Sequence, residues 1–279
     1  MSYKTILVHC DASPATAHRV LLAAELSWRF GSHLVGMHTC PPFEAPPLFE
    51  SGTSMDGLYT VYDESMKADK AAARAIFDKA IGSKVQSIEW RSVEGYADDQ
   101  LVLQARYADL VVLGQSNPRG AKGIPVPAHL PEAVAMSTGR AVLVVPYIGA
   151  PKTPGKTVMV CWNSSREAAR AASDAMPFLT DAEKVVILVV DPSRATGHGS
   201  EPGADVATWL VRHGVKATVQ RDIAVDGDVG ATILSRAADH GADMIVMGIY
   251  GHSRVREFVL GGVSRTLLGS MTVPVLMAH

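Results

Sequence analysis

The sequence predicts an α/β protein with two tandem, doubly wound, Rossmann-like domains, each a five-stranded parallel sheet with helices on both faces. Three observations lead to this prediction. The chain has 279 residues, more than the roughly 150 of an average domain. Apolar, β-branched runs alternate with helix-like stretches, as in parallel sheets that are covered on both faces. Finally, three segments recur in the same order in the two halves.

The repeated segments indicate a tandem duplication. KTILVHCDAS at 4–13 matches KTVMVCWNSS at 156–165, YADLVVLGQSNP at 107–118 matches GADMIVMGIYGH at 241–252, and GRAVLVVP at 139–146 matches TVPVLMAH at 272–279. Chance similarity between short apolar strands explains one such match but not three in order. The halves meet in a segment with two prolines and two glycines, so we expect domains at 1–148 and 155–279.

The first half opens with an apolar strand that runs into Asp11. Ser13 and Pro14 are expected to cap and start a helix over 15–30, which Gly31 ends.

A long loop in the first half and one tryptophan in each half give further expectations. The proline- and glycine-rich segment 41–57 makes this half longer than the second, and we expect it to form a long loop or lid. Trp28 and, in the second half, Trp209 lie in amphipathic helices and are expected in the core or in a domain contact.

The second half shows the alternation of strands and helices most clearly. We expect its strands at 157–162, 185–191, 216–225, 242–248 and 273–279, and its helices at 166–179, 204–214, 228–241 and 257–271. Ser164 or Ser165 is the candidate N-cap of the first of these helices.

Composition excludes several classes of protein. The net charge is −2, from 26 basic and 28 acidic residues, so nothing in the overall charge favours nucleic acid or an anionic membrane as a partner. No stretch reaches the roughly 18 apolar residues of a membrane-spanning helix, and the start of the chain lacks the apolar core of a signal peptide. Three scattered cysteines make no disulfide framework. We therefore expect a cytoplasmic protein.

Glycines follow the strand expected at 242–248. Their spacing is Gly248-x2-Gly251-x9-Gly261-Gly262, with Ser264 two residues later. Such glycines let backbone N–H groups approach an anion, and the start of the next helix adds unpaired donors and its positive dipole end. The alternative is that Gly248 and Gly251 only make the turn after a buried strand, and that Gly261 and Gly262 let helix and sheet pack closely. Neither the Walker phosphate-binding loop nor a G-x-G-x-x-G fingerprint is present.

This spacing resembles the universal stress protein family, whose nucleotide-binding members carry G-x2-G-x9-G-[S/T] after the fourth strand. The first strand with its following serine, the strand VVILVVD and the closing VPVLM extend the resemblance, which covers both halves. It implies a tandem universal stress protein with an adenine nucleotide alpha hydrolase-like fold. The closing strands would then pair, making a pseudo-dimer within one chain. The sequence leaves open whether chains also form a homodimer.

The resemblance implies a set of nucleotide-binding residues in the second half. The family's acidic residue after the first strand falls on Asn163, and the position that meets adenine falls on Val190. The phosphate-binding positions fall on Gly248, Gly251, Gly261, Gly262 and Val263, with Met247 beneath them and Ser264 as a further hydroxyl position. The sequence departs from the family at Asn163, which is not acidic, and at Gly262, which replaces a Ser or Thr.

The function that the resemblance implies is stress-response or regulatory binding of ATP, with Mg²⁺ accompanying the phosphates, and at most slow ATP hydrolysis. The first half keeps the acidic position as Asp11, with Ser13 following. It lacks the closing glycines, however, and Pro118, Pro125, Pro127 and Pro131 remove backbone donors that a phosphate would need. We therefore predict one nucleotide site per chain, in the second domain, and assign no catalytic residue and no metal site.

Three other interpretations stay open. A protein of this fold that has lost nucleotide binding would act as a scaffold or interaction protein, which the departures at Asn163 and Gly262 favour. An enzyme could work in the first-half cleft with Asp11, His9 and His38. A metal could be held by side chains from the first two strands, although strand alternation sends two of them to opposite faces. These candidate ligands are His9, Cys10, Asp11, His38 and Cys40.

Overall fold

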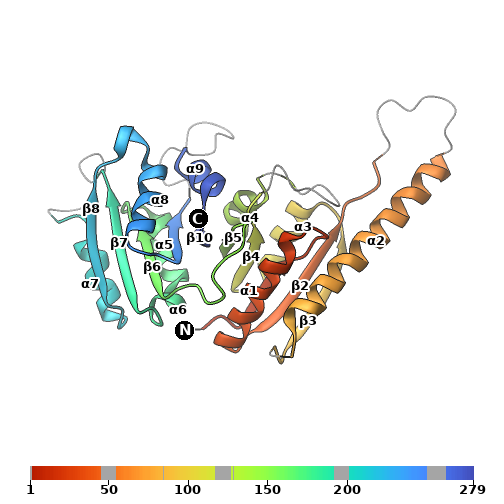
Figure 1. The fold of residues 1–279 in the computed structure, drawn as a ribbon, viewed down its shortest axis with the longest axis horizontal. Coiled ribbons are helices and arrows are strands. Elements are labelled where there is room, and N and C mark those ends of the chain that lie inside the picture. The colour runs from red at the N-terminus through yellow and green to blue at the C-terminus, as the bar shows by residue number, and fades with distance from the viewer. Residues whose placement is uncertain are drawn as a thin grey trace.

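The chain folds into two α/β halves that share one sheet of ten strands, in a computed structural model (Figure 1). The structure describes residues 2–44, 55–83, 85–116, 127, 129–191, 201–249 and 262–279. The predicted fold class, two tandem doubly wound units, is confirmed.

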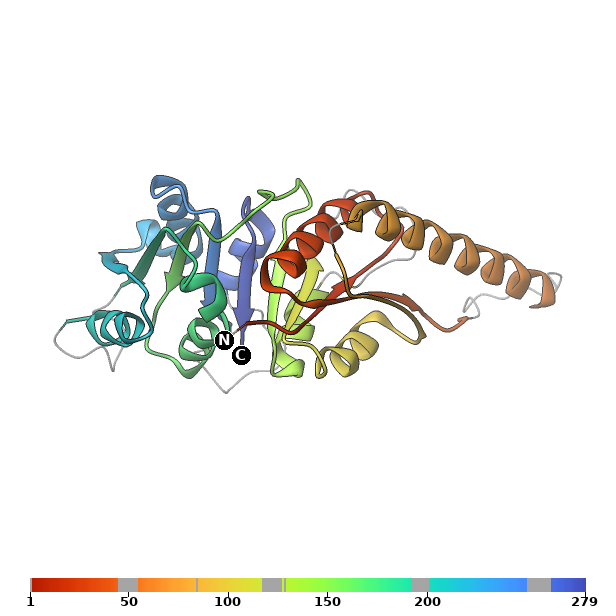
Figure 2. The same cartoon turned by 90° about the horizontal axis from the view of Figure 1, so that it is seen from below.

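The first half alternates strands and helices. Its strands are β1 (Thr5–His9), β2 (His33–Cys40), β3 (Ile88–Glu94), β4 (Leu110–Gly114) and β5 (Ala141–Val145). Its helices are α1 (Ala15–Phe30), α2 (Met55–Ile81), α3 (Ala97–Ala105) and α4 (Leu130–Thr138). Figures 1 and 2 show α2 extending beyond the end of the sheet.

The second half repeats the pattern. Its strands are β6 (Thr157–Cys161), β7 (Lys184–Val190), β8 (Ala217–Asp222), β9 (Met244–Gly248) and β10 (Val275–Ala278). Its α-helices are α5 (Arg166–Asp174), α6 (Met176–Leu179), α7 (Ala204–Arg212), α8 (Val229–Asp239) and α9 (Gly262–Ser270).

The strand order shows at which strand ends each half is expected to bind a ligand. The sheet runs β3-β2-β1-β4-β5-β10-β9-β6-β7-β8, parallel within each half. The winding reverses between β1 and β4 and again between β6 and β9, and folds of this type bind ligands at the carboxyl ends of strands at such points. The expected ligand position of each half is therefore at these strand ends.

Buried apolar side chains form a layer on each face of the sheet. One cluster includes side chains of α1, α2, α5, α6 and α7, with Leu26, Phe77 and Leu210 among them. The other includes side chains of α3, α4, α8 and α9. In the described part of the chain, no helix combines the length and apolar character that crossing a bilayer requires.

The two halves are joined by a strand pair and by aromatic packing. β5 and β10 pair antiparallel, with Val144 opposite Val275. The rings of Tyr3 and Phe30 from the first half pack on Phe178 of the second, at centroid distances of 5.7 Å and 5.3 Å. The Tyr3 hydroxyl also donates to the carbonyl of Asp174 at 2.6 Å. The halves thus form the predicted pseudo-dimer within one chain.

Most expected elements are present, with differences at their ends. The helix expected at 166–179 is two helices, α5 and α6, and Pro177 in the first turn of α6 explains the break because proline cannot continue the hydrogen-bond ladder. The loop expected at 41–57 is shorter, since α2 begins at Met55. The helix expected at 257–271 is described from Gly262 onward.

Two local expectations in the first half are wrong. Trp28 is 60% exposed rather than in the core. Ser13 does not cap α1 through its side chain: the residue before the helix is Pro14, and no side-chain cap bond forms there. Gly31 ends α1 in the left-handed conformation, with φ 64°, as expected.

Candidate functional site

The predicted nucleotide-binding residues of the second half gather at one edge of the sheet. Asn163 follows β6, Val190 ends β7, and Met247 and Gly248 end β9. Because β6 pairs with both β7 and β9, the carboxyl ends of these strands lie side by side. Gly262, Val263 and Ser264 form the first turn of α9, which follows β9 in the chain. Gly251 and Gly261 lie outside the described residues.

Asn163 builds the turn that leads into α5. Its Oδ1 accepts a hydrogen bond from the Ser165 backbone N–H at 3.2 Å, and Ser165 Oγ caps the helix by accepting from Ala168 N–H at 3.1 Å. In the first half, Asp11 Oδ1 accepts from Ser13 N–H at 2.8 Å. The amide of Asn163 therefore keeps the structural role that the carboxylate has in the other copy.

Two residues beside this edge have strained backbones. Ser164 has φ 59° and Asp191 has φ 50°, in the left-handed region that non-glycine residues avoid. Ser164 directly follows Asn163, and Asp191 directly follows Val190. Asp191 Oδ1 accepts from Ala224 N–H at 2.8 Å, which fixes the turn after β7. Such strain is concentrated at ligand sites in proteins.

Gly248 serves helix packing. A Cβ added there would come within 2.5 Å of the backbone N of Ala168 and of the carbonyl carbon of Glu167, in the first turn of α5. Only glycine lets β9 and α5 approach this closely. Close packing of helix on sheet, which was considered from the sequence only for Gly261 and Gly262, therefore accounts for this glycine.

The first turn of α9 has the properties of an anion site. It contains no acidic residue. A Cβ added at Gly262 would meet no described atom within 4 Å. Ser264 is buried, and Met247 is buried in the core beneath. The N–H groups at the start of a helix and the positive end of its dipole favour negative charge.

The first half fills the equivalent space with its own side chains. Arg19 of α1 donates from Nε to the carbonyl of His9 at 2.6 Å and from Nη2 to Asp11 Oδ2 at 3.1 Å. A Cβ at Gly114, at the end of β4, would come within 2.2 Å of Arg19 Nη1. The repeat that aligns Lys4 with Lys156 aligns Arg19 with Ala171, so the equivalent position of the second half holds no cation.

Both carboxylate oxygens of Asp11 accept hydrogen bonds from neighbouring residues of the first half. Thr16 Oγ1 donates to its Oδ1 at 2.6 Å, in addition to the bonds from Ser13 and Arg19. Burial by itself would raise the pKa of Asp11, but the Arg19 guanidinium and these hydrogen bonds hold it well below its ordinary value. This carboxylate is engaged in structure rather than offered to a ribose.

The helix that would close a phosphate site in the first half carries the wrong groups. The first turn of α4 contains Pro131, which has no N–H, and Glu132, whose buried Oε2 has no hydrogen-bond partner among the described residues. Burial raises the pKa of Glu132. A proline and a carboxyl at this position oppose phosphate binding.

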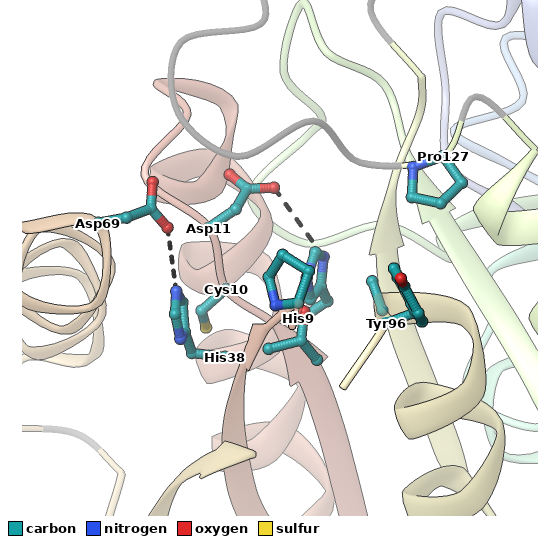
Figure 3. A pocket seen from close by; sticks show the side chains of 10 residues that line it. His9, Cys10, Asp11, His38, Asp69, Tyr96 and Pro127 are labelled. Atoms are coloured by element: carbon teal, nitrogen blue, oxygen red, sulfur yellow. Dashed lines mark hydrogen bonds and ion pairs between the residues drawn. The ribbon is translucent and has the colours of Figure 1, made fainter. Parts of the chain in front are cut away.

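A small cavity of about 70 Å³ lies at the carboxyl ends of the first-half strands. Figure 3 shows His9 and Asp11 reaching it from the end of β1, His38 from β2 and Asp69 from α2. The cavity is lined by His9, Cys10, Asp11, His38, Thr39, Pro41, Asp69, Tyr96, Ala97 and Pro127. The three residues of the first-half enzyme hypothesis, Asp11, His9 and His38, are therefore together.

The histidine at the end of β1 is held neutral. Burial, followed by the positive charge of Arg19, lowers the pKa of His9 from 6.5 to about 4. Between these two pH values the unfolded chain binds a proton at His9 that the folded chain does not. The free energy of unfolding therefore falls as the pH drops from about 6.5 to about 4, and His9 changes it no further below pH 4. The size of this effect is roughly 3 kcal/mol.

This leads to a first prediction. In an NMR titration, the ring signals of His9, assigned with the variant His9→Gln, are expected to stay unchanged from pH 7.5 to 5. A midpoint for His9 near its ordinary value of about 6.5 would contradict the burial argument.

The histidines and cysteines do not assemble into a metal site among the described residues. No group of three or more His, Cys, Asp or Glu side chains there is arranged to hold an ion. Burial raises the pKa of the Cys10 thiol to about 12, which opposes the thiolate form that metals need.

Three functional residues were missed by the sequence reasoning: Arg19, Asp69 and Glu132. Arg19 had a detectable signal, since it is a cation on the buried face of α1 that also carries Thr16, Ala23 and Leu26. Asp69 lies 31 residues from its partner His38. Nothing local in the sequence indicates that pairing.

A family comparison covers nearly the whole chain. The model described as "Universal stress protein family" matches twice, at residues 2–146 and 155–279. No curated protein matches the chain at a significant level.

Solved structures with the same fold include full-length matches. A universal stress protein from Archaeoglobus fulgidus is 14% identical with a TM-score of 0.70, covering 98% of this chain and 95% of that one. A functionally unknown protein from Pseudomonas aeruginosa is 12% identical with a TM-score of 0.57, covering 99% and 92%. A universal stress protein in complex with cAMP is 24% identical with a TM-score of 0.39, covering 52% of this chain and 98% of that one. At these identities the full-length matches establish the shared fold.

Proposed function

Because this chain belongs to the universal stress protein family, with two copies of its domain in tandem, we propose that it binds an adenine nucleotide, ATP, in the second domain as a stress-response or regulatory module. The site is formed by Asn163 and Val190 at the strand ends and by the first turn of α9, Gly262 to Ser264. Mg²⁺ would accompany the phosphates and neutralise part of their charge.

The observation that carries this proposal is a difference between the first turn of α9 and the first turn of α4, the corresponding helix of the first half. The first turn of α9 has no acidic residue and keeps the N–H of Val263. The first turn of α4 has Pro131 in that region and the buried Glu132. Helix α9 therefore presents hydrogen-bond donors and its positive dipole end to an anion. Helix α4 presents a carboxyl group instead and lacks one backbone donor.

The proposed role is binding rather than efficient catalysis. Asn163 stands where the family has an acidic residue, and an amide is not a general base. The Oδ1 atom of Asn163 also accepts a hydrogen bond from the Ser165 backbone N–H, which holds the turn before α5. We expect ATP hydrolysis to be slow or absent.

Calorimetric titration of the full chain with ATP and Mg²⁺ tests the proposal. The expected result is saturable binding of one nucleotide per chain. Absence of any response at millimolar ATP would support the alternative, a scaffold or interaction protein of the same fold, which the replacement of the acidic residue by Asn163 and of the hydroxyl residue by Gly262 favours.

A second prediction concerns the missing hydroxyl. The variant Gly262→Ser restores the residue type that nucleotide-binding members carry, and no described atom lies within 4 Å of the new Cβ. A hydrogen bond to a charged phosphate is worth about 1.5–3 kcal/mol, so we expect ATP to bind roughly tenfold or more tightly in calorimetry. Gly269→Ser, at the other end of α9 and equally unobstructed, is the matched control. Equal affinity in the two variants would argue against a phosphate at Gly262.

A further inference from the structure

The three cysteines have different surroundings. Cys10 is buried and Cys161 is partly exposed, and desolvation raises the pKa of each thiol to about 12. Cys40, the last residue of β2, is partly exposed, and its Sγ lies 3.5 Å from Nδ1 of His38 on the same strand. Residues two apart on a strand point to the same face, which explains the contact.

His38 is oriented by a carboxylate. Its Nε2 lies 3.0 Å from Asp69 Oδ2, and both side chains are almost completely buried (Figure 3). The ring of Trp90 stacks on the imidazole at a centroid distance of 6.4 Å and an angle of 20°. Because an ionised carboxylate only accepts hydrogen bonds, Nε2 carries the proton and Nδ1 presents its lone pair to the thiol of Cys40.

The order thiol, imidazole, carboxylate is that of an activated nucleophile. In such a set the imidazole takes the proton of the thiol, and the carboxylate stabilises the imidazolium that forms. We propose that Cys40 is a reactive thiol of the first domain, with His38 as its base and Asp69 as the positioning residue, and that its substrates are small peroxides.

The chemical step balances with a peroxide as the oxidant. The Cys40 proton moves from Sγ to His38 Nδ1, and the sulfur attacks one peroxide oxygen. The S–O bond forms as the O–O bond breaks, so the sulfur is oxidised to a sulfenic acid and the second oxygen is reduced. With hydrogen peroxide that oxygen leaves as hydroxide and takes the proton from Nδ1, giving water.

The surroundings favour a coupled proton transfer and a small substrate. Glu94 is the register partner of Cys40 on β3, and the Tyr62 hydroxyl donates to the carbonyl of Pro41. A lone thiolate beside Glu94 and Asp69 would be repelled, whereas transfer to His38 leaves the net charge of the cluster unchanged. Cys40 is partly exposed, so its sulfur is accessible to an oxidant as small as hydrogen peroxide.

Alkylation of the full chain with iodoacetamide, followed by mass spectrometry of each cysteine, tests whether the thiol is activated. In urea all three cysteines are equally accessible, and this gives the reference rate. In the native protein we expect Cys40 to react about tenfold faster than in urea, and Cys10 and Cys161 to react more slowly than in urea. A native rate for Cys40 equal to or below its unfolded rate would overturn the proposal, and this comparison needs no variant.

Variants and an oxidant then test the roles of the partners. Asp69→Asn is expected to lower the native rate of Cys40 about tenfold, whereas Asp78→Asn, an exposed site on the same helix paired with Arg74, leaves it unchanged. Circular dichroism confirms that both variants are folded. Brief treatment with hydrogen peroxide and dimedone is expected to label Cys40 alone. Labelling of none of the cysteines, or an unchanged rate in folded Asp69→Asn, would count against the assignment.

Discussion

Replacing Phe178 with alanine is expected to lower the free energy of unfolding by about 3–5 kcal/mol, the range for loss of a buried phenylalanine. Phe178 is fully buried and joins the two halves, because its ring packs on both Tyr3 and Phe30. Its removal leaves a cavity at this contact that the flanking sheet cannot close. Urea unfolding followed by circular dichroism measures the loss.

The control for this prediction is an exposed aromatic residue. Tyr107 is 74% exposed, so Tyr107→Ala is expected to change stability by about 0.5 kcal/mol or less. If Phe178→Ala cost no more than that control, the aromatic cluster would not be a main contact between the halves.

Replacing Val263 with proline is expected to have the largest effect on nucleotide affinity. Proline removes one N–H from the first turn of α9, while its ring fits the first turn of a helix, as Pro131 does in α4. Loss of a hydrogen bond to a charged phosphate costs about 1.5–3 kcal/mol. We therefore expect ATP to bind from about tenfold to more than a hundredfold more weakly in calorimetry.

Val263→Ala separates the donor from the side chain. It keeps the N–H and is expected to bind ATP nearly as the parent chain does. If alanine and proline weakened binding equally, the valine side chain rather than the backbone donor would make the contact. If neither had an effect, the phosphates would not lie at α9.

The repeating layers of the fold could be predicted from the sequence because the signals are local. β-Branched runs predict strands wherever they occur, and α1 lies where the helix at 15–30 was expected. Helix α2 was not predicted because its pattern is weak: of its 27 residues only Asp69, Ala73 and Phe77 are buried. A mostly exposed helix leaves little periodic apolar pattern to detect.

The candidate site was predictable only in part. The candidate residues at the ends of β6, β7 and β9 follow from the family resemblance, and topology then brings them together. What occupies the first-half cleft does not follow in this way: the helical pattern shows that Arg19 is buried but not that it reaches Asp11, and no local pattern pairs Asp69 with His38. The role of Gly248 was equally hidden, since both close packing and phosphate contact call for glycine.

The central claim is that the two copies of one fold have diverged, so that the second domain alone takes the nucleotide. A crystal structure of the full chain grown with ATP and Mg²⁺ tests this most directly. We predict nucleotide density at the carboxyl ends of β6 and β9, with phosphates at the first turn of α9, and the side chains of Arg19 and Asp11 still paired in the first domain. Nucleotide in the first domain, in both domains, or in neither at millimolar ATP would contradict the claim.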